Sequence, residues 1–256
     1  METLDFLEAL RREVAAMQSI VAGADLDASV PTCPGWSMRD LVVHTGQVHR
    51  HKTASVRDDW TSGPAPWPDG PEGDAVEWFD EGIDEMLGVF ATADLGAPSW
   101  TWCSHDHDVE WWVRRMAHET LIHGADAALA VGELPAIDEA LATDGVDELL
   151  DEMMVGAPSW AELVEGEQVV VLVTPQKSWM LRTATWTGES PKGQRFEDEQ
   201  GLIYAEAADE ADTVISCAAS ELDLWLWGRG SLRAEAVTGD DSLKDLVRSI
   251  AIEATQ

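Results

Sequence analysis

Hydrophobic residues recur at steps of three and four along four segments of the N-terminal half of the chain. This spacing places them on one face of a helix. The predicted helices cover residues 3–23, a segment from Ser37 past His51, residues 75–91 and residues 109–131. Segments rich in proline and glycine separate the first three helices, and such residues interrupt helices. Four helices with two long connections are typical of a four-helix bundle.

The pattern changes in the C-terminal half. A bridging helix is predicted at about 138–155, followed by β-branched and alternating segments that indicate strands at 168–174, 178–186, 201–206, 212–217 and 231–237. Two further helices are predicted, over SELDLWLWGR (220–229) and over 241–254. The fold class is therefore α+β. We predict an N-terminal four-helix bundle with the bridging helix (1–157) and a smaller C-terminal α+β domain (158–256).

Charge and composition narrow the classes of partner. The chain has 49 acidic and 16 basic residues, a formal net charge of −33, which disfavours binding to nucleic acid or to anionic membranes. It contains no apolar run long enough for a membrane helix and no signal peptide at its start, so a cytoplasmic location is expected. Its three cysteines form no CxxC pair, which disfavours both a disulfide framework and a cysteine zinc site.

The histidines are confined to one part of the chain, since all seven lie between positions 44 and 123. In AHETLIHGADA (117–127), Glu119 and His123 are four residues apart and project from the same helix face, where they can share one ion. His118 points about 100° away on the same helix. The HExxH pattern of zinc proteases does not fit, because the second histidine comes one residue too late.

A third ligand must come from another helix. The second helix offers His44, His49 and His51, and His44 shares its face with the apolar residues that point into the bundle. His51 lies two turns further on, about 10 Å away. We therefore predict a divalent-metal site of His44, Glu119 and His123 with an open fourth position, the arrangement of catalytic zinc. An isolated ExxxH pair is also compatible with an ordinary surface pair or a buried structural histidine.

The segments CPGWSMRDLVVHTGQVHRH (33–51) and RRMAHETLIHGADA (114–127) resemble the mycothiol-dependent maleylpyruvate isomerase family. The resemblance implies a DinB-like metal-binding bundle and a C-terminal domain similar to sterol-carrier domains. It also implies Zn²⁺ or another divalent metal on His44, Glu119 and His123, mycothiol as a small thiol co-substrate, and an actinobacterial origin. A basic residue of the C-terminal domain is expected to serve catalysis, and Arg229 in LWLWGRG is the best match.

The expected function is a metal- and mycothiol-dependent isomerase or thiol S-transferase that acts on a small electrophile, as a monomer or homodimer. Arg229 or Arg182 is expected to hold a substrate carboxylate. Two alternatives stay open: a non-catalytic metal- or ligand-binding module, and a purely structural metal with His49 or His118 as fourth ligand. The tryptophan cluster before the fourth helix either lines a ligand pocket or packs in the core (Trp100, Trp102, Trp111 and Trp112).

Overall fold

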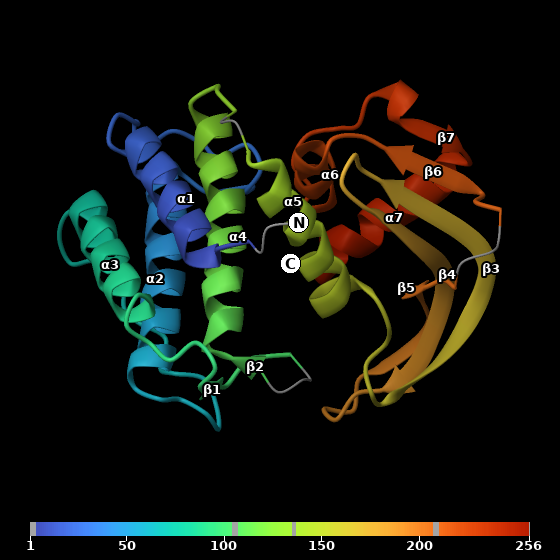
Figure 1. The fold of residues 1–256 in the computed structure, drawn as a ribbon, viewed down its shortest axis with the longest axis horizontal. Helices are drawn as coiled ribbons and strands as arrows, with labels where there is room; N and C mark the ends of the chain where they lie inside the picture. The colour runs from blue at the N-terminus through green and yellow to red at the C-terminus, as the bar shows by residue number, and fades with distance from the viewer. Residues whose placement is uncertain (1–3, 104–106, 135–136, 207–209, 256) are drawn as a thin grey trace. The chain divides into compact units, whose positions relative to one another are not determined.

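The computed structural model describes residues 4–103, 107–134, 137–206 and 210–255. The chain forms two compact units, Met1–Ala136 and Ile137–Gln256. The first is helical apart from one small hairpin, and the second combines helices with a mixed sheet (Figure 1). The predicted α+β class is therefore confirmed. None of the described helices combines the length and the apolar composition that a membrane span requires.

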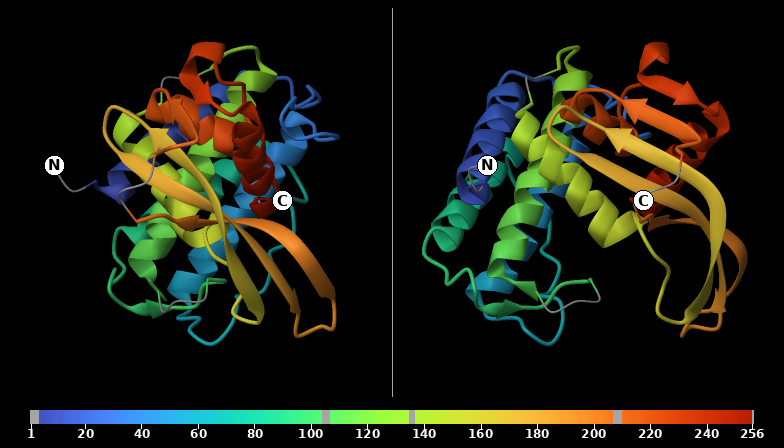
Figure 2. Two further views of the ribbon diagram at one scale, coloured as in Figure 1. Left: turned by 90° about the vertical axis from the view of Figure 1, so that its right-hand side faces the viewer. Right: turned by 45° about the vertical axis from the view of Figure 1, so that its right-hand side comes forward.

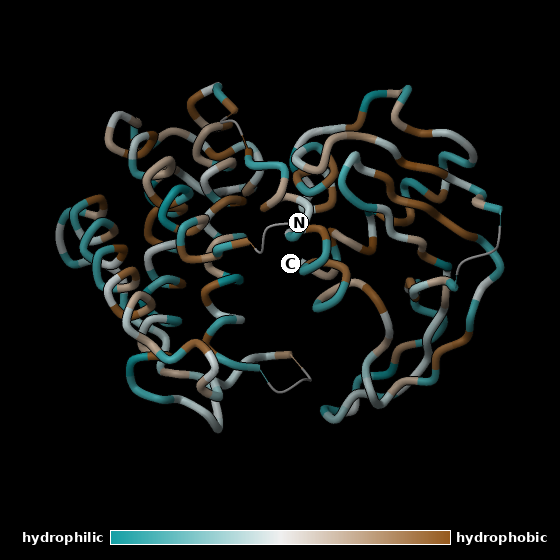
Figure 3. The backbone as a smooth tube through the Cα atoms, in the orientation of Figure 1, coloured by the Kyte–Doolittle hydropathy of each residue, from teal (hydrophilic) through white to brown (hydrophobic). Residues whose placement is uncertain are grey.

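The first unit is a bundle of the four predicted helices. These are α1 (Phe6–Val21), α2 (Met38–Arg57), α3 (Ala75–Phe90) and α4 (Val109–Ala130). Helix α1 packs against α4 and α3, while α2 packs against α3 and α4. Along α1, α2 and α3 the residues alternate between hydrophobic and hydrophilic, as the tube in Figure 3 shows, because only part of the surface of these helices faces the bundle core.

Local sequence determines where α2 begins. The Ser37 side chain accepts a hydrogen bond from the Asp40 backbone N–H, and the Asp40 carboxylate accepts one from the Ser37 backbone N–H at 2.8 Å. This reciprocal capping box satisfies two backbone donors that a helix start leaves unpaired. Because the start is fixed, Leu41, Val42 and Val48 all turn into the core. His44 emerges from the same helix between them.

Helix α4 is the most enclosed element of the bundle. Its buried residues lie on most of its circumference and include Trp112, Met116, Leu121 and Ile122. A two-stranded hairpin precedes it, formed by β1 (Pro98–Ser99) and β2 (His107–Asp108). Asp108 then caps α4, since its carboxylate accepts a hydrogen bond from the Trp111 backbone N–H. The site residues of α4 are therefore held by an element that can move little without disrupting the core.

The second unit is a five-stranded sheet with helices on one face (Figure 1 and Figure 2). The strand order is β5-β4-β3-β6-β7, in which β3 and β6 are parallel and the other pairs are antiparallel. The elements in chain order are α5 (Glu139–Leu149), a π-helical turn η1 (Leu150–Met154), β3 (Ala161–Val173), β4 (Ser178–Glu189), β5 (Arg195–Tyr204), β6 (Thr213–Ser216), α6 (Ala219–Leu226), the 3₁₀ turn η2 (Ala234–Ala236), β7 (Val237–Gly239) and α7 (Asp241–Ala254).

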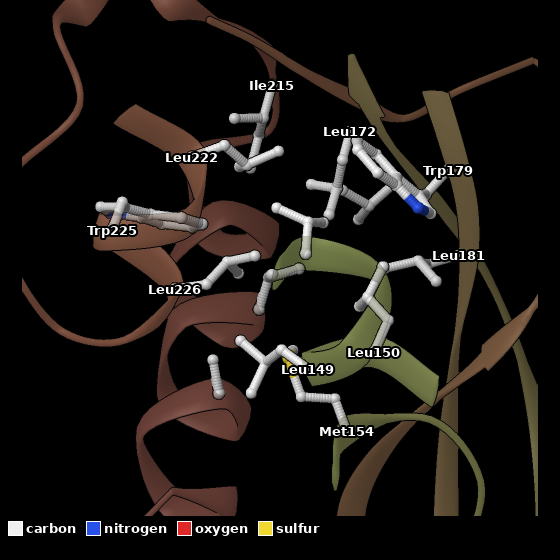
Figure 4. Close-up of a cluster of buried hydrophobic side chains, with 14 of the residues drawn as sticks. Leu149, Leu150, Met154, Leu172, Trp179, Leu181, Ile215, Leu222, Trp225 and Leu226 are labelled. Carbon is white, nitrogen blue, oxygen red and sulfur yellow. The ribbon is translucent and has the colours of Figure 1, made fainter. Parts of the chain in front are cut away.

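The core of this unit shows where the bridging helix belongs. Leu149, Leu150 and Met154 pack in the same hydrophobic cluster as Leu172 and Leu181 of the sheet (Figure 4). Helix α5 and its π-helical turn are thus part of the second unit. We expected this helix to close the first domain at residue 157, whereas the structure divides the chain between residues 136 and 137.

Two strands differ from the sequence-based expectation. The strand expected at 231–237 lies at Val237–Gly239 instead, after the 3₁₀ turn. Its partner β6 has only four residues. Only Val237–Gly239 lies opposite Thr213–Ile215 of β6 and pairs with it. Strand β3 begins earlier than expected, at Ala161, because its polar first half pairs with β4 beyond a β-bulge after Glu165. Polar residues at both faces conceal such a strand in the sequence.

Candidate metal centre

The three predicted ligands meet between α2 and α4. The donor atoms of His44, Glu119 and His123 all lie within 4.8 Å of one another. Glu119 Oε1 lies 3.3 Å from His123 Nε2 and 3.9 Å from His44 Nε2. The two imidazole rings face each other edge to face with centroids 5.2 Å apart. The spacing that places Glu119 and His123 on one helix face and His44 on an inward face thus brings all three to one point.

These distances match the requirements of a small divalent cation. Zinc–nitrogen and zinc–oxygen bonds of about 2.0–2.1 Å in a tetrahedron place ligand atoms about 3.3 Å apart. The Glu119–His123 separation has this value, whereas the Glu119–His44 separation is longer at 3.9 Å, so His44 must move closer to Glu119 to share a cation with it. The side chains are 35%, 18% and 12% exposed for His44, Glu119 and His123, so the centre opens to solvent mainly beside His44.

A buried carboxylate orients His123. The His123 Nδ1–H donates to Asp126 Oδ2 at 3.0 Å, which leaves Nε2 directed at Glu119. Asp126 is fully buried and also accepts hydrogen bonds from the Thr32 hydroxyl and the Cys33 thiol. A carboxylate behind a histidine ligand fixes its tautomer and increases its basicity. Sequence reasoning did not identify this role, although Asp126 follows His123 by three residues and so shares its helix face.

Arg115 holds the other oxygen of Glu119. Its guanidinium donates to Glu119 Oε2 at 2.9 Å, and its side chain is 2% exposed. Glu119 Oε1 is consequently the oxygen that remains directed at the two imidazoles. Sequence reasoning also missed this contact. The i, i+4 spacing of Arg115 and Glu119 was the available signal.

The charges of the centre depend on one another. Burial favours the neutral form of Glu119, yet the hydrogen bond from His123, its charge and that of Arg115 hold the pKa of Glu119 well below its usual range. Burial likewise disfavours a charged His123, but hydrogen bonds to Asp126 and Glu119 raise its pKa to about 9 in the absence of a cation. Burial and the neighbouring His123 lower the pKa of His44. A cation at this centre must therefore displace a proton from His123.

Trp36 covers one side of the centre. Its ring lies 4.8 Å from the His44 ring and 6.4 Å from the His123 ring, measured between centroids. It is the last residue of the CPGW turn, in which Gly35 adopts a positive φ of 85°. Glycine adopts this conformation without strain, so the turn presents Trp36 to the imidazoles at little cost. The indole restricts the orientations that the two rings can adopt.

The other histidines of the two helices lie elsewhere. His49 is fully buried, and its Nε2 is 2.9 Å from the Thr120 hydroxyl, which itself donates to the Met116 carbonyl. Burial lowers the pKa of His49 to about 4. His118 is also buried and lies against the ring of Phe6. Within the described residues, neither belongs to the group of His44, Glu119 and His123, so neither supplies the fourth protein ligand of a purely structural metal site.

The two arginines considered for substrate binding belong to the second unit. Arg229 follows α6, and its guanidinium donates to the Trp227 carbonyl oxygen. Arg182 lies on β4 and donates to the Glu167 carbonyl oxygen at 3.3 Å. The catalytic role of Arg229 remains a prediction.

The fold and the centre define a class of two-domain proteins, with a helical bundle that presents three donors suited to a divalent cation and a separate α/β domain. The chain belongs to the mycothiol maleylpyruvate isomerase family. The family model of the isomerase's N-terminal domain matches residues 7–128, and the model of its C-terminal domain matches residues 140–245. None of the curated proteins matches the sequence closely enough to count as a relative.

Two solved structures share the fold. A crystal structure of a histidine-to-alanine mutant of the mycothiol-dependent maleylpyruvate isomerase is 14% identical, with a TM-score of 0.60. A second crystal structure, of the mycothiol-dependent maleylpyruvate isomerase, is 13% identical with a TM-score of 0.57. In both cases 93% of this chain and 95% of the other chain are covered. At this level of identity the likeness concerns the fold.

Proposed function

We propose that this protein is a divalent-metal- and mycothiol-dependent enzyme that isomerises a small electrophile or transfers the thiol to it. The observation that carries the proposal is the convergence of His44, Glu119 and His123 with donor atoms within 4.8 Å of one another. Membership in the maleylpyruvate isomerase family supports mycothiol as the thiol. A metal with three protein donors leaves a coordination position open for a substrate.

The residues of the centre fit zinc, with His44, Glu119 and His123 as its ligands. Zinc in such a site supplies Lewis acidity and favours the thiolate form of a bound thiol. Asp126 keeps the His123 lone pair directed into the centre, and Arg115 keeps Glu119 Oε1 there. Trp36 shields the imidazoles from one side. These neighbours preserve the arrangement of the donors while substrates bind and leave.

The proposed chemistry is addition of the thiol sulfur to an activated double bond, with a proton transferred to the neighbouring carbon. In an isomerase, rotation about the resulting single bond is followed by loss of the same proton and release of the thiol. In a transferase, the adduct leaves as product. Arg229 is the proposed residue of the C-terminal domain that holds a substrate carboxylate through paired hydrogen bonds. The two reactions differ in whether the thiol is consumed.

The first test concerns the metal. Zinc content is measured after purification and dialysis for the wild type, His44→Ala and His51→Gln. His51 is the control on the same helix, since its ring binds the Ala65 carbonyl oxygen and lies outside the group of three donors. We expect near-stoichiometric zinc in the wild type and in His51→Gln, and a large loss in His44→Ala. Equal metal in all three contradicts the ligand assignment.

The second test concerns the reaction. Zinc-loaded protein is mixed with mycothiol and a panel of small electrophiles that includes maleylpyruvate, and both thiol and product are followed. Product formation at constant thiol indicates an isomerase, whereas loss of thiol with product indicates a transferase. Metal binding without thiol-dependent turnover of any compound would instead support a non-catalytic binding module.

A further inference from the structure

Lys52 is a buried cation beside the centre. It lies on α2, two turns after His44, and is 7% exposed. Its ammonium nitrogen is 4.5 Å from the ring centre of Trp112 and 5.3 Å from that of Trp102. Trp102 itself is 46% exposed, so the ammonium lies under an indole that reaches the surface. The two rings also contact each other, with centroids 5.3 Å apart, so together they cover one side of the ammonium.

The environment of Lys52 differs from that of the other three lysines. Lys177 pairs with Asp147, Lys244 pairs with neighbouring aspartates, and Lys192 is exposed. Within the described residues, Lys52 makes neither an ion pair nor a hydrogen bond. The chain has 49 acidic residues, so many of its positions carry a carboxylate that could pair with a lysine. Composition therefore does not account for the lack of a carboxylate partner of Lys52 in the part of the chain that the structure describes.

This placement of Lys52 is unfavourable for the protein alone. Removing an ammonium from most of its water costs free energy, and contact with aromatic rings recovers only part of that cost. Burial is the main cause that lowers the pKa of Lys52 to about 8, with the charge of Glu119 opposing and that of Arg115 adding to the effect. The side chain is nevertheless mostly charged at neutral pH. An anion bound to the Lys52 ammonium would compensate for the water that the ammonium loses on burial.

The neighbouring carboxylate is already engaged. Glu119 binds Arg115 through one oxygen and faces the two imidazoles with the other. With a divalent ion bound, the positive charges of the ion, Arg115 and Lys52 exceed the negative charges of Glu119 and Asp126. The centre is therefore locally positive in a protein of net charge −33. Such a local field attracts a small anion and repels cations.

We propose that Lys52 binds a carboxylate of the electrophilic substrate, with Trp102 and Trp112 covering the other side of the ammonium. This inference rests on the proposed function and deepens it, because it assigns a carboxylate-binding residue to the helical bundle in addition to the proposed Arg229. Lys52 supplies a charged hydrogen-bond donor for the carboxylate oxygen. The two indoles exclude water from one side of the ion pair, which strengthens it. Trp102 precedes α4 and Trp112 lies in its first turn, so this arrangement gives both a role in ligand binding.

Binding of a non-reacting probe tests the inference separately from catalysis. Maleate, a small rigid dicarboxylate, and its uncharged diamide are titrated by calorimetry into zinc-loaded wild type, Lys52→Met, Lys52→Arg and Lys192→Met. Lys192→Met is the control that removes the same charge from an exposed position. We expect maleate to bind at least tenfold more weakly to Lys52→Met, within about threefold to Lys52→Arg and unchanged to Lys192→Met. The diamide should not distinguish the variants.

The outcomes separate this inference from the proposed function. Equal maleate affinity in the wild type and Lys52→Met, or no binding of maleate to the wild type, overturns the inference. Binding that depends on Lys52 without thiol-dependent turnover removes the proposed enzyme but leaves the anion site. Turnover in which Lys52→Met leaves the KM of carboxylated electrophiles unchanged overturns the anion site alone. If Lys52→Met does not bind zinc or shows no cooperative thermal unfolding, Lys52→Gln replaces it in the same titrations.

Discussion

Replacing Asp126 by asparagine tests how the second layer of residues controls the centre. Asparagine has nearly the same shape, so its carbonyl oxygen can still accept from His123 and its amide can still face Thr32. Only the negative charge behind His123 is removed. Loss of such a partner typically weakens metal binding by about 10- to 100-fold. The size of the change in zinc affinity should depend on pH, because Asp126 also stabilises the proton with which zinc competes.

The pH dependence follows from the pKa of about 9 for His123. At pH 7 the wild type must first release a proton from His123, which costs about 3 kcal/mol, whereas at pH 9 this cost nearly vanishes. In Asp126→Asn the pKa of His123 falls toward its ordinary value, so the variant is spared most of that cost at pH 7. We therefore expect zinc binding to be at least about tenfold weaker in the variant at pH 9, with a difference of only a few-fold at pH 7.

The assay is competition with a chromophoric chelator that buffers free zinc at pH 7, 8 and 9. Asp84→Asn is the matched control, because Asp84 lies exposed on α3 and its replacement removes the same charge elsewhere. The control should bind like the wild type at each pH. A difference between Asp126→Asn and wild type that stays constant with pH refutes the proton competition. Equal zinc affinity at pH 9 refutes the orienting role of Asp126.

Three further predictions address the centre and the two cores. Glu119→Gln should lose most bound zinc by elemental analysis, and it should lower the free energy of unfolding in urea by about 3–5 kcal/mol, because its buried ion pair with Arg115 is broken. His49 has a pKa of about 4 when folded, so the unfolded chain binds the extra proton between about pH 6.5 and 4. Wild-type stability should therefore fall by up to about 3 kcal/mol as the pH falls through that window, and His49→Gln should remove that part of the pH dependence in urea melts. Leu149→Ala, at a fully buried position, should cost about 2–5 kcal/mol of unfolding free energy, and an unchanged urea midpoint would contradict the assigned core.

The helices of the bundle could be predicted because their signals are local. Apolar residues at three- and four-residue steps, together with the Ser37–Asp40 capping box, place α2 within a few residues of its observed bounds. The same periodicity brings Glu119 and His123 to one face, and the inward face of α2 brings His44 to them. The boundary between the units was harder to predict from the sequence. The apolar residues of α5 indicate that the helix is buried, but not against which unit it packs.

The contacts around the centre could not be predicted because they depend on how helices and loops meet in three dimensions. The CPGW turn brings Thr32 and Cys33 to Asp126, a contact that spans more than ninety residues. Lys52 follows His51 in a polar stretch, where a lysine is ordinarily expected to be solvated. Only the packing of the tryptophans against α2 shows that it is buried. Helical periodicity carries no information about such contacts.

The polar residues buried on α4 indicate that its sequence serves the metal centre as well as the stability of the bundle. Arg115, Thr120 and Asp126 are all nearly inaccessible to solvent, and each buried polar group costs stability unless it is hydrogen-bonded. Arg115 and Asp126 bind Glu119 and His123, respectively. Apolar residues of similar volume often make a bundle core more stable than a buried ion pair does. Stability alone therefore does not account for these charges at positions adjoining the donors, whereas the need to hold Glu119 and His123 in one orientation does.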